Sequence, residues 1–373
     1  MTEPLFREVA PVPLDVASCN GSYIIDKRGK RYLDFIMGWC VGNAGWNKKV
    51  ISDSMKKFSG PTYVSPTYKY SRWEVLAKKL VSLMPQKGYT CFRATGGTEA
   101  VELALKISKA YNRRNKFIAF DGAYHGQSLA CLGLVGIHED KFGPYGESYI
   151  RLKIGDWEET TQKAVDAITR GDVSAFISEP ILCNLGVIVP PISFFKEVRE
   201  ACSKTDTLFI MDEVATGFGR TGKVFGFEHY DVKPDIVAIA KGFSSGYAPI
   251  GATIADARIA ESMRFDFSNY STFGWHPLAV ESALANIQYI GIRLIKNSEK
   301  MGAVLSDKLS EFCKPEGKGL CIGFGIRNPD LEGDCRNDGL LISVMGKRAL
   351  LFPALDIGKD EIEKAVKIIK NNF

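Results

Sequence analysis

The sequence predicts an α/β protein with a mostly parallel central sheet, helices on both faces of that sheet, and a smaller α+β domain. Three observations indicate this fold class. The 373 residues are 45% hydrophobic and 24% charged, which is typical of a globular chain with room for one large and one smaller domain. Short apolar runs alternate with helical patterns from about residue 75 to residue 270, and this alternation favours parallel strands covered by helices. The two ends of the chain lack the alternation, which indicates a second unit.

Apolar, β-branched runs of the central region are predicted as strands. In chain order they are KFIAF at 116–120, VSAFIS at 173–178, LFIM at 208–211, DIVAIA at 235–240 and IGATI at 250–254. A run that is apolar at nearly every position suits a strand that is buried on both faces. Helical patterns separate the strands, as at 99–111 and 193–204.

The two ends of the chain are predicted to fold together. The N-terminal GSYIIDKRGKRYLDFI predicts two short strands around the turn Lys27-Arg28-Gly29, and the C-terminal hundred residues mix helical stretches with LLISVM and ALLF. We therefore predict three segments: 1–45 as the N-terminal part of the small domain, 46–274 as the large domain, and 275–373 as the C-terminal part of the small domain.

The composition narrows the classes of partner and compartment. The net charge is +5 with interspersed charges, so no basic stripe points to nucleic acid, although a mildly positive chain can attract phosphate-bearing small molecules. The nine cysteines form no CxxC pair and no cluster with zinc spacing. The start MTEPLFREVAPVP has no apolar signal core, and no apolar run is long enough to cross a bilayer. We expect a cytoplasmic protein without a metal, nucleic-acid or membrane partner.

Chemically distinctive residues follow the predicted strands. The first strand is followed by Asp121-Gly122-Ala123-Tyr124-His125-Gly126, the second by Glu179, the third by Asp212 and the fourth by Lys241. Ligands of open parallel sheets bind beyond the carboxyl ends of the strands. Taken singly, a strand-tip aspartate is more often a turn or a helix cap, and a terminal lysine is usually solvated. Such tips on successive strands at one edge instead indicate a binding site.

A possible phosphate site lies upstream, at Thr95-Gly96-Gly97-Thr98, directly before the helical pattern EAVELALKISKAY. Glycines at a helix start let a ligand approach free backbone N–H groups, and the helix dipole favours an anion there. A glycine-rich loop in which threonine only caps the helix is an equally good interpretation of this stretch alone.

One cofactor accounts for all of these residues, namely pyridoxal 5′-phosphate. Its phosphate suits the helix start, its ring suits an aromatic face such as Tyr124, and its pyridine nitrogen needs a carboxylate such as Asp212 to stay protonated. Its aldehyde needs a lysine with which to form a Schiff base. This explains why a buried strand leads into Lys241, because an ammonium is costly to bury unless it is paired or neutralised.

A second glycine motif competes with this interpretation. Residues 217–222, GFGRTG, match the GxGxxG pattern of dinucleotide-binding proteins and follow a predicted strand. However, KVFGFEHYD comes next, so no helix is predicted to hold a pyrophosphate, and no ribose-binding acid lies at the expected offset. The sequence therefore argues against a nicotinamide dehydrogenase.

From about Gly21 to its end, the sequence resembles the class III, or ω-amino, aminotransferases of the fold-type I pyridoxal-phosphate enzymes. The most specific stretch is FIMDEVATGFGRTGKVFGFEHYDVKPDIVAIAKGFSSGYAPIGA. The resemblance implies that Lys241 is the Schiff-base lysine and that Asp212 pairs with the pyridinium nitrogen. It implies further cofactor contacts, made by Gly96, Gly97, Thr98, Tyr124, His125, Glu179 and Val214, with Val214 packing opposite Tyr124. Thr272, in STFGWHP, would reach the phosphate of the neighbouring subunit, which implies a homodimer with a shared site.

Two features bear on the substrate. Near the C-terminus, many family members carry an arginine that binds the α-carboxylate of the substrate. Leu350 occupies that position here, with Arg348 and Lys347 nearby. Trp39, in GWCVGNAGW, resembles the substrate-pocket tryptophan of the ω-amine branch, although a core aromatic of the small domain is an equal alternative.

The resemblance implies ping-pong transamination between an amine donor and an oxo-acid or aldehyde acceptor. Lys241 would act as the general base, and Asp212 would keep the ring nitrogen protonated. An aminomutase resembling the glutamate-1-semialdehyde enzymes, which the Asn-x-Gly form of SEPILCNLG favours, and a racemase remain alternatives, because they share the first proton abstraction. A non-catalytic scaffold that holds the cofactor is a further alternative.

Overall fold

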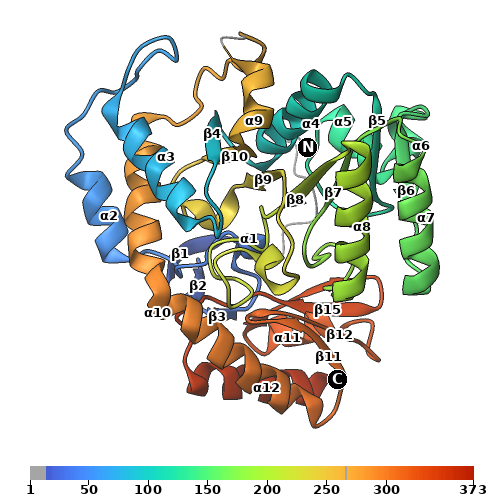
Figure 1. The fold of residues 1–373 in the computed structure, drawn as a ribbon. Helices are drawn as coiled ribbons and strands as arrows, with labels where there is room; N and C mark the ends of the chain where they lie inside the picture. The colour runs from blue at the N-terminus through green and yellow to red at the C-terminus, as the bar shows by residue number, and fades with distance from the viewer. Residues whose placement is uncertain (1–13, 265–266) are drawn as a thin grey trace, which may run out of the picture.

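A computed structural model describes residues 14–264 and 267–373, and its secondary structure forms three sheets with surrounding helices (Figure 1). The seven-stranded central sheet has the order β4-β10-β9-β8-β7-β5-β6. Its strands are β4 (Tyr89–Ala94), β5 (Lys116–Phe120), β6 (Tyr149–Leu152), β7 (Val173–Ser178), β8 (Leu208–Asp212), β9 (Ile236–Ile239) and β10 (Gly251–Asp256). Only β10 runs antiparallel to its neighbours β4 and β9, so the predicted mostly parallel sheet is confirmed.

The two edge strands, β4 and β6, were not predicted. Both interrupt their apolar residues with polar ones, as in YTCFRA and YIRL, and both are only partly buried. An edge strand has one neighbour and more solvent contact, so its sequence lacks the continuous apolar run of a central strand. The five predicted strands all form, with ends shifted by at most a few residues.

Helices cover both faces of the central sheet, as predicted. On one face, α7 (Trp157–Thr169) and α8 (Ile192–Thr205) pack against each other over an aromatic cluster that includes Phe120, Phe176 and Phe194. On the other face lie α4 (Gly97–Asn112) and α5 (Leu129–Val135), where Gly133 approaches the ring of Tyr149. The remaining helices of this part of the chain are α2 (Lys49–Lys56), α3 (Ser71–Leu83), α6 (Glu139–Phe142), α9 (Ala257–Ala260) and the 3₁₀ helices η1 (Gly226–His229), η2 (Lys241–Phe243), η3 (Glu261–Met263) and η4 (Phe267–Asn269).

The N-terminal and C-terminal segments share a sheet. Its strands are β1 (Val16–Asn20), β2 (Tyr23–Asp26), β3 (Arg31–Asp34) and β13 (Leu340–Leu341), and β3 pairs with β13 in parallel. The third sheet is antiparallel and contains β11 (Pro315–Lys318), β12 (Cys321–Gly325), β15 (Arg348–Leu351) and β14 (Ser343–Met345). This pairing supports grouping residues 14–45 with 275–373, and residues 1–13 of the predicted N-terminal segment lie outside the described residues.

Long helices join these parts. The helix α10 (Pro277–Ser310) runs 34 residues, changes direction at Gly291 (φ 43°), and lies along the side of the molecule in Figure 1. It contacts α2 and α3 at one end and α12 (Lys359–Asn372) at the other, while α11 (Leu331–Asn337) packs on α12. The remaining element, α1 (Met37–Cys40), is a single turn between β3 and α2.

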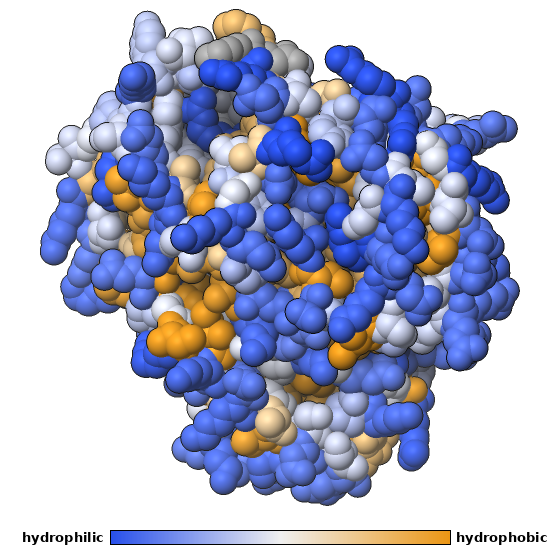
Figure 2. Space-filling model, viewed as in Figure 1, coloured by the Kyte–Doolittle hydropathy of each residue, from blue (hydrophilic) through white to orange (hydrophobic). Residues whose placement is uncertain are grey.

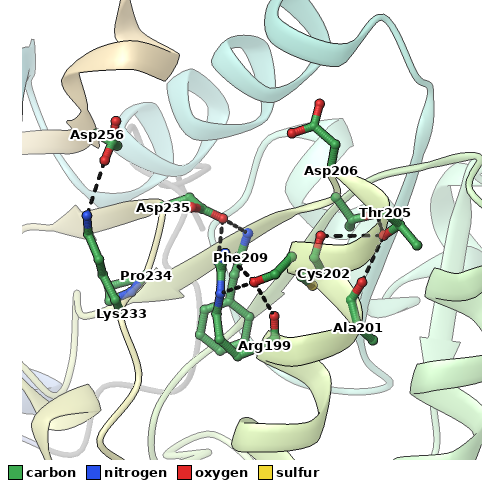
Figure 3. Close-up of polar contacts among 12 residues, drawn as sticks. Arg199, Ala201, Cys202, Thr205, Asp206, Phe209, Lys233, Pro234, Asp235 and Asp256 are labelled. Carbon is green, nitrogen blue, oxygen red and sulfur yellow. Dashed lines mark hydrogen bonds and ion pairs between the residues drawn. The ribbon is translucent and has the colours of Figure 1, made fainter.

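The amino ends of β8 and β9 are closed by a polar network (Figure 3). Asp235 Oδ2 accepts a hydrogen bond from the Phe209 N–H at 2.8 Å and pairs with the guanidinium of Arg199. Beside it, Nζ of Lys233 lies 3.4 Å from Oδ2 of Asp256. Ligands of open parallel sheets bind at the opposite edge, beyond the carboxyl ends of the strands.

On the face shown in Figure 2, hydrophilic side chains predominate and hydrophobic ones form smaller groups between them. Among the described helices, none combines the length and the apolar character needed to cross a membrane.

Candidate active site

A cavity of about 410 Å³ lies beyond the carboxyl ends of β7, β8 and β9. Residues from six separate stretches of the chain meet there. Of the residues predicted from the sequence, the cavity is lined by Trp39, Gly97, Thr98, Tyr124, His125, Glu179, Asp212, Val214 and Lys241. The neighbouring Gly96 is the N-cap residue of α4.

Lys241 is separated from the end of β9 by Ala240 alone and begins the single turn η2. Its backbone has φ 43°, in the left-handed region that a side chain with a Cβ rarely adopts. The carbonyl of Lys241 accepts hydrogen bonds from the N–H groups of Ser244 and Ser245, each at 3.2 Å. Lys241 is half-buried, so its side chain lies between the core and the open cavity. Backbone strain of this kind is concentrated at functional sites.

Asp212 ends β8 and lies almost fully buried at the base of the cavity. Its Oδ2 is 2.7 Å from Nδ1 of His125, and its Oδ1 accepts a hydrogen bond from the Val214 N–H at 3.0 Å. The second ring nitrogen of His125, Nε2, is buried and has no partner among the described residues. The sequence placed both residues at strand tips, and the structure brings them into direct contact.

The start of α4 approaches the same cavity. A Cβ at Gly97 would lie 2.9 Å from Cγ1 of Val214, so glycine lets the backbone of α4 come this close to the Val214 side chain. Across the opening, a Cβ at Gly126 would lie 2.6 Å from the hydroxyl oxygen of Thr98. Gly96 makes no side-chain cap, so the first N–H groups of α4 are available to a ligand from the cavity side.

Glu179 follows β7 and is 3% exposed. Its Oε1 has no hydrogen-bond partner in the described part of the chain, while the backbone N–H of Cys183 donates to the same carboxyl group. Burial, and to a lesser extent the negative charge of Asp212, raises the pKa of Glu179 to about 8. Glu179 therefore presents a neutral carboxyl group to the cavity near neutral pH.

Trp39 enters the cavity from a left-handed turn. Met37, Gly38, Trp39 and Cys40 have φ values of 48°, 59°, 59° and 65°. Except at Gly38, which has no Cβ, each left-handed residue costs about 1–2 kcal/mol, because Cβ crowds the following carbonyl. Asp34 offsets part of this cost, since its Oδ1 accepts the N–H groups of Ile36 at 2.9 Å and Met37 at 2.8 Å. The turn directs Trp39 toward the cavity, where its ring centroid lies 5.9 Å from that of Phe352.

The wall beside Trp39 is apolar and contains thiols. Cys40 and Cys183 line the cavity, and Sγ of Cys183 lies 3.7 Å from Sγ of Cys321 behind it. Leu350 is fully buried in the same apolar cluster and does not reach the cavity itself. Arg348 is directed elsewhere, because its guanidinium donates to the Gly186 carbonyl and pairs with Glu316. No arginine is among the described residues that line the cavity.

Thr272 lies outside this cavity. It is exposed, in the segment between η4 and α10. It is not among the residues that line the cavity within one chain, so its predicted contact with cofactor phosphate stays a prediction.

The cavity also contains residues that sequence reasoning did not select. These are Cys40, Gly126, Cys183, Asn184 and Ala215. Each lies next to a predicted residue or inside a quoted motif, so its nearness in the sequence to a predicted residue is what could have identified it. The direction of the side chains was not available, because it depends on how each loop packs after its strand ends.

The glycine motif at 217–222 is not a dinucleotide site. The next element is the four-residue 3₁₀ helix η1, and no α-helix starts at the motif. Arg220 from this motif is fully buried and donates to the carbonyls of Leu320 and Pro353 and to Oδ1 of Asn43. The motif therefore ties the central sheet to the C-terminal part of the chain.

The residues present fit pyridoxal phosphate. A buried carboxylate, a half-buried lysine and a glycine-walled helix start face one cavity. Two buried polar atoms at this cavity, His125 Nε2 and Glu179 Oε1, lack partners within the described residues, which is typical of a site built for a polar ligand.

Comparison with known proteins agrees with a pyridoxal-phosphate site made of these residues. Residues 6–373 match the family model described as aminotransferase class-III. The chain is 32% identical to the acetylornithine aminotransferase of Aquifex aeolicus, over 98% of each chain. It is 33% identical to the acetylornithine aminotransferase of Archaeoglobus fulgidus, over 94% of this chain and 93% of the relative.

Solved structures of transaminases share the whole fold. A Bacillus anthracis aminotransferase matches with a TM-score of 0.92 at 30% identity, covering 100% of this chain and 96% of that chain. An amine transaminase from an uncultivated Pseudomonas species, solved in its PLP-bound form, matches with a TM-score of 0.90 at 27% identity, covering 100% and 98%. This chain therefore belongs to the class III aminotransferase family and is a pyridoxal-phosphate-dependent enzyme of fold type I.

Proposed function

We propose that this enzyme moves a terminal, or ω-, amino group from a donor to an oxo-acid or aldehyde acceptor in a ping-pong reaction. The observation that carries the proposal is the wall of the cavity. Trp39, Cys40 and Cys183 line it, Leu350 packs behind it, and no arginine lines the cavity in the described part of the chain. A bidentate arginine is the usual partner of a substrate carboxylate.

The carboxyl group of Glu179 further restricts the kinds of donor that suit the cavity. Its buried Oε1 is without a partner among the described residues, and a cationic neighbour would stabilise the ionised form of this carboxyl group. A donor that carries a second amine would supply that neighbour. An uncharged amine that packs against Trp39 would suit the apolar wall equally well.

The residues of the chain suit the proton transfers of transamination. Lys241 Nζ would take the proton from the reacting carbon of the donor and return it to the cofactor side of the bond. Asp212, whose Oδ2 lies 2.7 Å from Nδ1 of His125, would pair with the ring nitrogen of the cofactor at the base of the cavity. Pyridoxal phosphate, when bound, supplies the electron sink for the negative charge that proton removal leaves. The buried apolar wall would exclude water from Lys241 while the proton moves.

Acetylornithine is a second candidate donor, because the two relatives compared above are named acetylornithine aminotransferases. Its free amine is terminal, but the compound also carries an α-carboxylate. The described cavity offers that group no guanidinium, which is why we place it second.

A donor panel tests the proposal. Full-length enzyme is mixed with putrescine, 1-phenylethylamine, acetylornithine or alanine, and pyridoxamine phosphate and free carbonyl product are both measured. Loss of a charge-assisted bidentate contact is worth about 1.5–3 kcal/mol, so we expect the first two donors to exceed alanine by roughly ten- to hundredfold in kcat/KM. Leading activity with alanine or aspartate would contradict the proposal, and Arg348 would then be tested first. Pyridoxamine phosphate without free carbonyl product would favour an aminomutase.

A matched pair of variants examines the wall itself. Leu350→Arg would restore a guanidinium near the cavity and should raise the activity with alanine relative to putrescine. Leu350→Met keeps the volume and the apolar character, so it should leave the ranking of donors unchanged.

We also propose that the enzyme is a cytoplasmic homodimer whose sites are shared between subunits. Exposed aromatic side chains next to Thr272 support the dimer, namely Tyr63, Phe267, Tyr270 and Phe273. Aromatic residues are enriched in protein interfaces, and a monomer rarely exposes several together. The cysteines, all free in the described chain, support a reducing compartment.

A further inference from the structure

The turn that carries Lys241 is held by an asparagine from a distant helix. Asn286 lies in α10 and is fully buried. Its Nδ2 donates to the carbonyl of Gly242 at 2.8 Å and to the carbonyl of Phe243 at 3.0 Å. These are the two residues that directly follow Lys241, so one amide group spans the turn.

This turn needs to be held, because it is strained. Lys241 has φ 43°, and residues in such regions persist only where the surrounding structure over-determines them. The contacts at Gly242 are equally tight, since a Cβ there would lie 2.4 Å from Nδ2 of Asn43. Asn43 is itself fixed by hydrogen bonds to the carbonyls of Gly217 and Phe218, each at 3.1 Å. The backbone after Lys241 is therefore in contact with two buried asparagines.

The position of Asn286 lowers the stability of the fold in one respect. Its Oδ1 is buried and has no partner in the described residues. Leaving a buried acceptor unpaired destabilises the fold, and a leucine of similar size would avoid that cost. The amide at position 286 is thus explained by what its Nδ2 does for the Lys241 turn, and not by packing in α10.

We propose that Asn286 is a positioning residue for Lys241: through the Gly242 and Phe243 carbonyls, it holds the strained turn in the one conformation from which Nζ reaches the cofactor aldehyde. Asn286 is not among the residues that line the cavity, so it acts through the backbone and touches neither substrate nor cofactor. The inference rests on the proposed role of Lys241.

The test separates covalent capture from cofactor binding. Full-length enzyme is freed of cofactor and mixed with pyridoxal phosphate, and the rate at which Nζ displaces the aldehyde oxygen as water is followed by absorbance and by borohydride trapping. The affinity for pyridoxamine phosphate, which has no aldehyde and forms no bond to Lys241, is measured in parallel. In Asn286→Leu we expect capture to slow by about tenfold or more, with the affinity for pyridoxamine phosphate within about twofold of wild type.

Asn297→Leu is the matched control. Asn297 lies in the same helix, and its Nδ2 also spans two carbonyls, those of Leu355 at 2.7 Å and Ile357 at 3.2 Å, but away from Lys241. It should leave both quantities unchanged. If Asn286→Leu does not fold, Asn286→Thr, which keeps one donor, is measured in the same two assays.

The outcomes are distinguishable. Capture at the wild-type rate in an Asn286 variant, or an equal loss of capture and of pyridoxamine phosphate affinity, would overturn the inference, because the residue would then be dispensable or merely structural. Trapping of wild-type enzyme at a residue other than Lys241 would overturn the proposed role of that lysine, and this inference with it.

Discussion

The two carboxyl groups of the cavity differ in their surroundings. Asp212 has a partner at each oxygen, His125 on one side and the Val214 N–H on the other. Glu179 is about equally buried, but its Oε1 has no partner among the described residues. Burial disfavours the charged form of a carboxyl group and so raises its pKa. Glu179 therefore suits a group that responds to pH or to a cationic donor.

The first prediction concerns Glu179 and pH. Its pKa is about 8 in the folded chain and 4.5 as its ordinary value. Between these pH values the folded chain holds a proton that the unfolded chain has lost, so the free energy of unfolding falls as pH rises and levels off above about pH 8. The Glu179 contribution over this window is roughly 3–5 kcal/mol. We expect Glu179→Gln to remove it, as measured by urea unfolding of cofactor-free enzyme at pH 5, 6.5 and 8.

Glu213 provides the internal control for that measurement. Burial raises its pKa to about 7, and it is present in both proteins, so its contribution cancels in the difference between wild type and variant. Identical pH slopes in the two proteins would show that Glu179 titrates as an ordinary carboxyl group.

At the level of elements, the two ends of β8 and β9 have different roles: one end carries residues of the cavity, and the other carries contacts that stabilise the fold. Their carboxyl ends present Asp212 and Lys241 to the cavity. At their amino ends Asp235 binds Arg199 of α8 and the Phe209 N–H (Figure 3). The separation means that one end can be changed without direct effect on the other.

The second prediction follows from this division. Asp235→Ala removes a partly buried ion pair and leaves the Phe209 N–H without its acceptor, so we expect the free energy of unfolding to fall by about 1–3 kcal/mol. The affinity for pyridoxamine phosphate should stay within twofold. Both are measured by urea unfolding and by ligand titration.

Glu200→Ala in α8 is the control for Asp235→Ala. It removes an exposed pair with Lys204, for which a change of less than about 1 kcal/mol is expected. A large loss of cofactor affinity in Asp235→Ala would show that the two ends of the strands are coupled.

At the level of the whole molecule, the exposed aromatic group around Thr272 lies away from the cavity of its own chain. Phe267 is 77% exposed and Phe273 is 62% exposed. The ring of Tyr63 lies 6.0 Å from that of Phe273, so segments far apart in the sequence build one surface. The proposed dimer would cover this surface and bring Thr272 to the second site.

The third prediction tests that assembly. If Thr272 contacts the phosphate of the neighbouring site, Thr272→Ala should weaken cofactor retention, and retention should depend on protein concentration. Sedimentation velocity and the fraction of bound cofactor after dilution measure the two effects. Thr169→Ala, at an exposed position in α7, should behave as wild type. A wild-type monomer that keeps its cofactor at all concentrations would contradict both the dimer and the shared site.

The sequence by itself determined the central strands and the residues at their tips. Runs such as KFIAF and VSAFIS are apolar throughout, and the strands β5 and β7 have the predicted ends. Parallel strands place their carboxyl ends at one edge, so Glu179, Asp212 and Lys241 were predicted to converge from order alone. The cofactor followed from the chemistry of those side chains.

Only the tertiary structure decided which way side chains face once a strand has ended. In the folded chain Arg348 contacts Gly186 and Glu316, and Leu350 packs behind the thiols of Cys40 and Cys183. Residues 37–40 form a left-handed turn. The tertiary structure also brings Asn286 to the turn of Lys241. The physical reason is that an apolar run is a local property of the chain, whereas the direction of a loop side chain and the partner of a buried amide are set by contacts between segments far apart in the sequence.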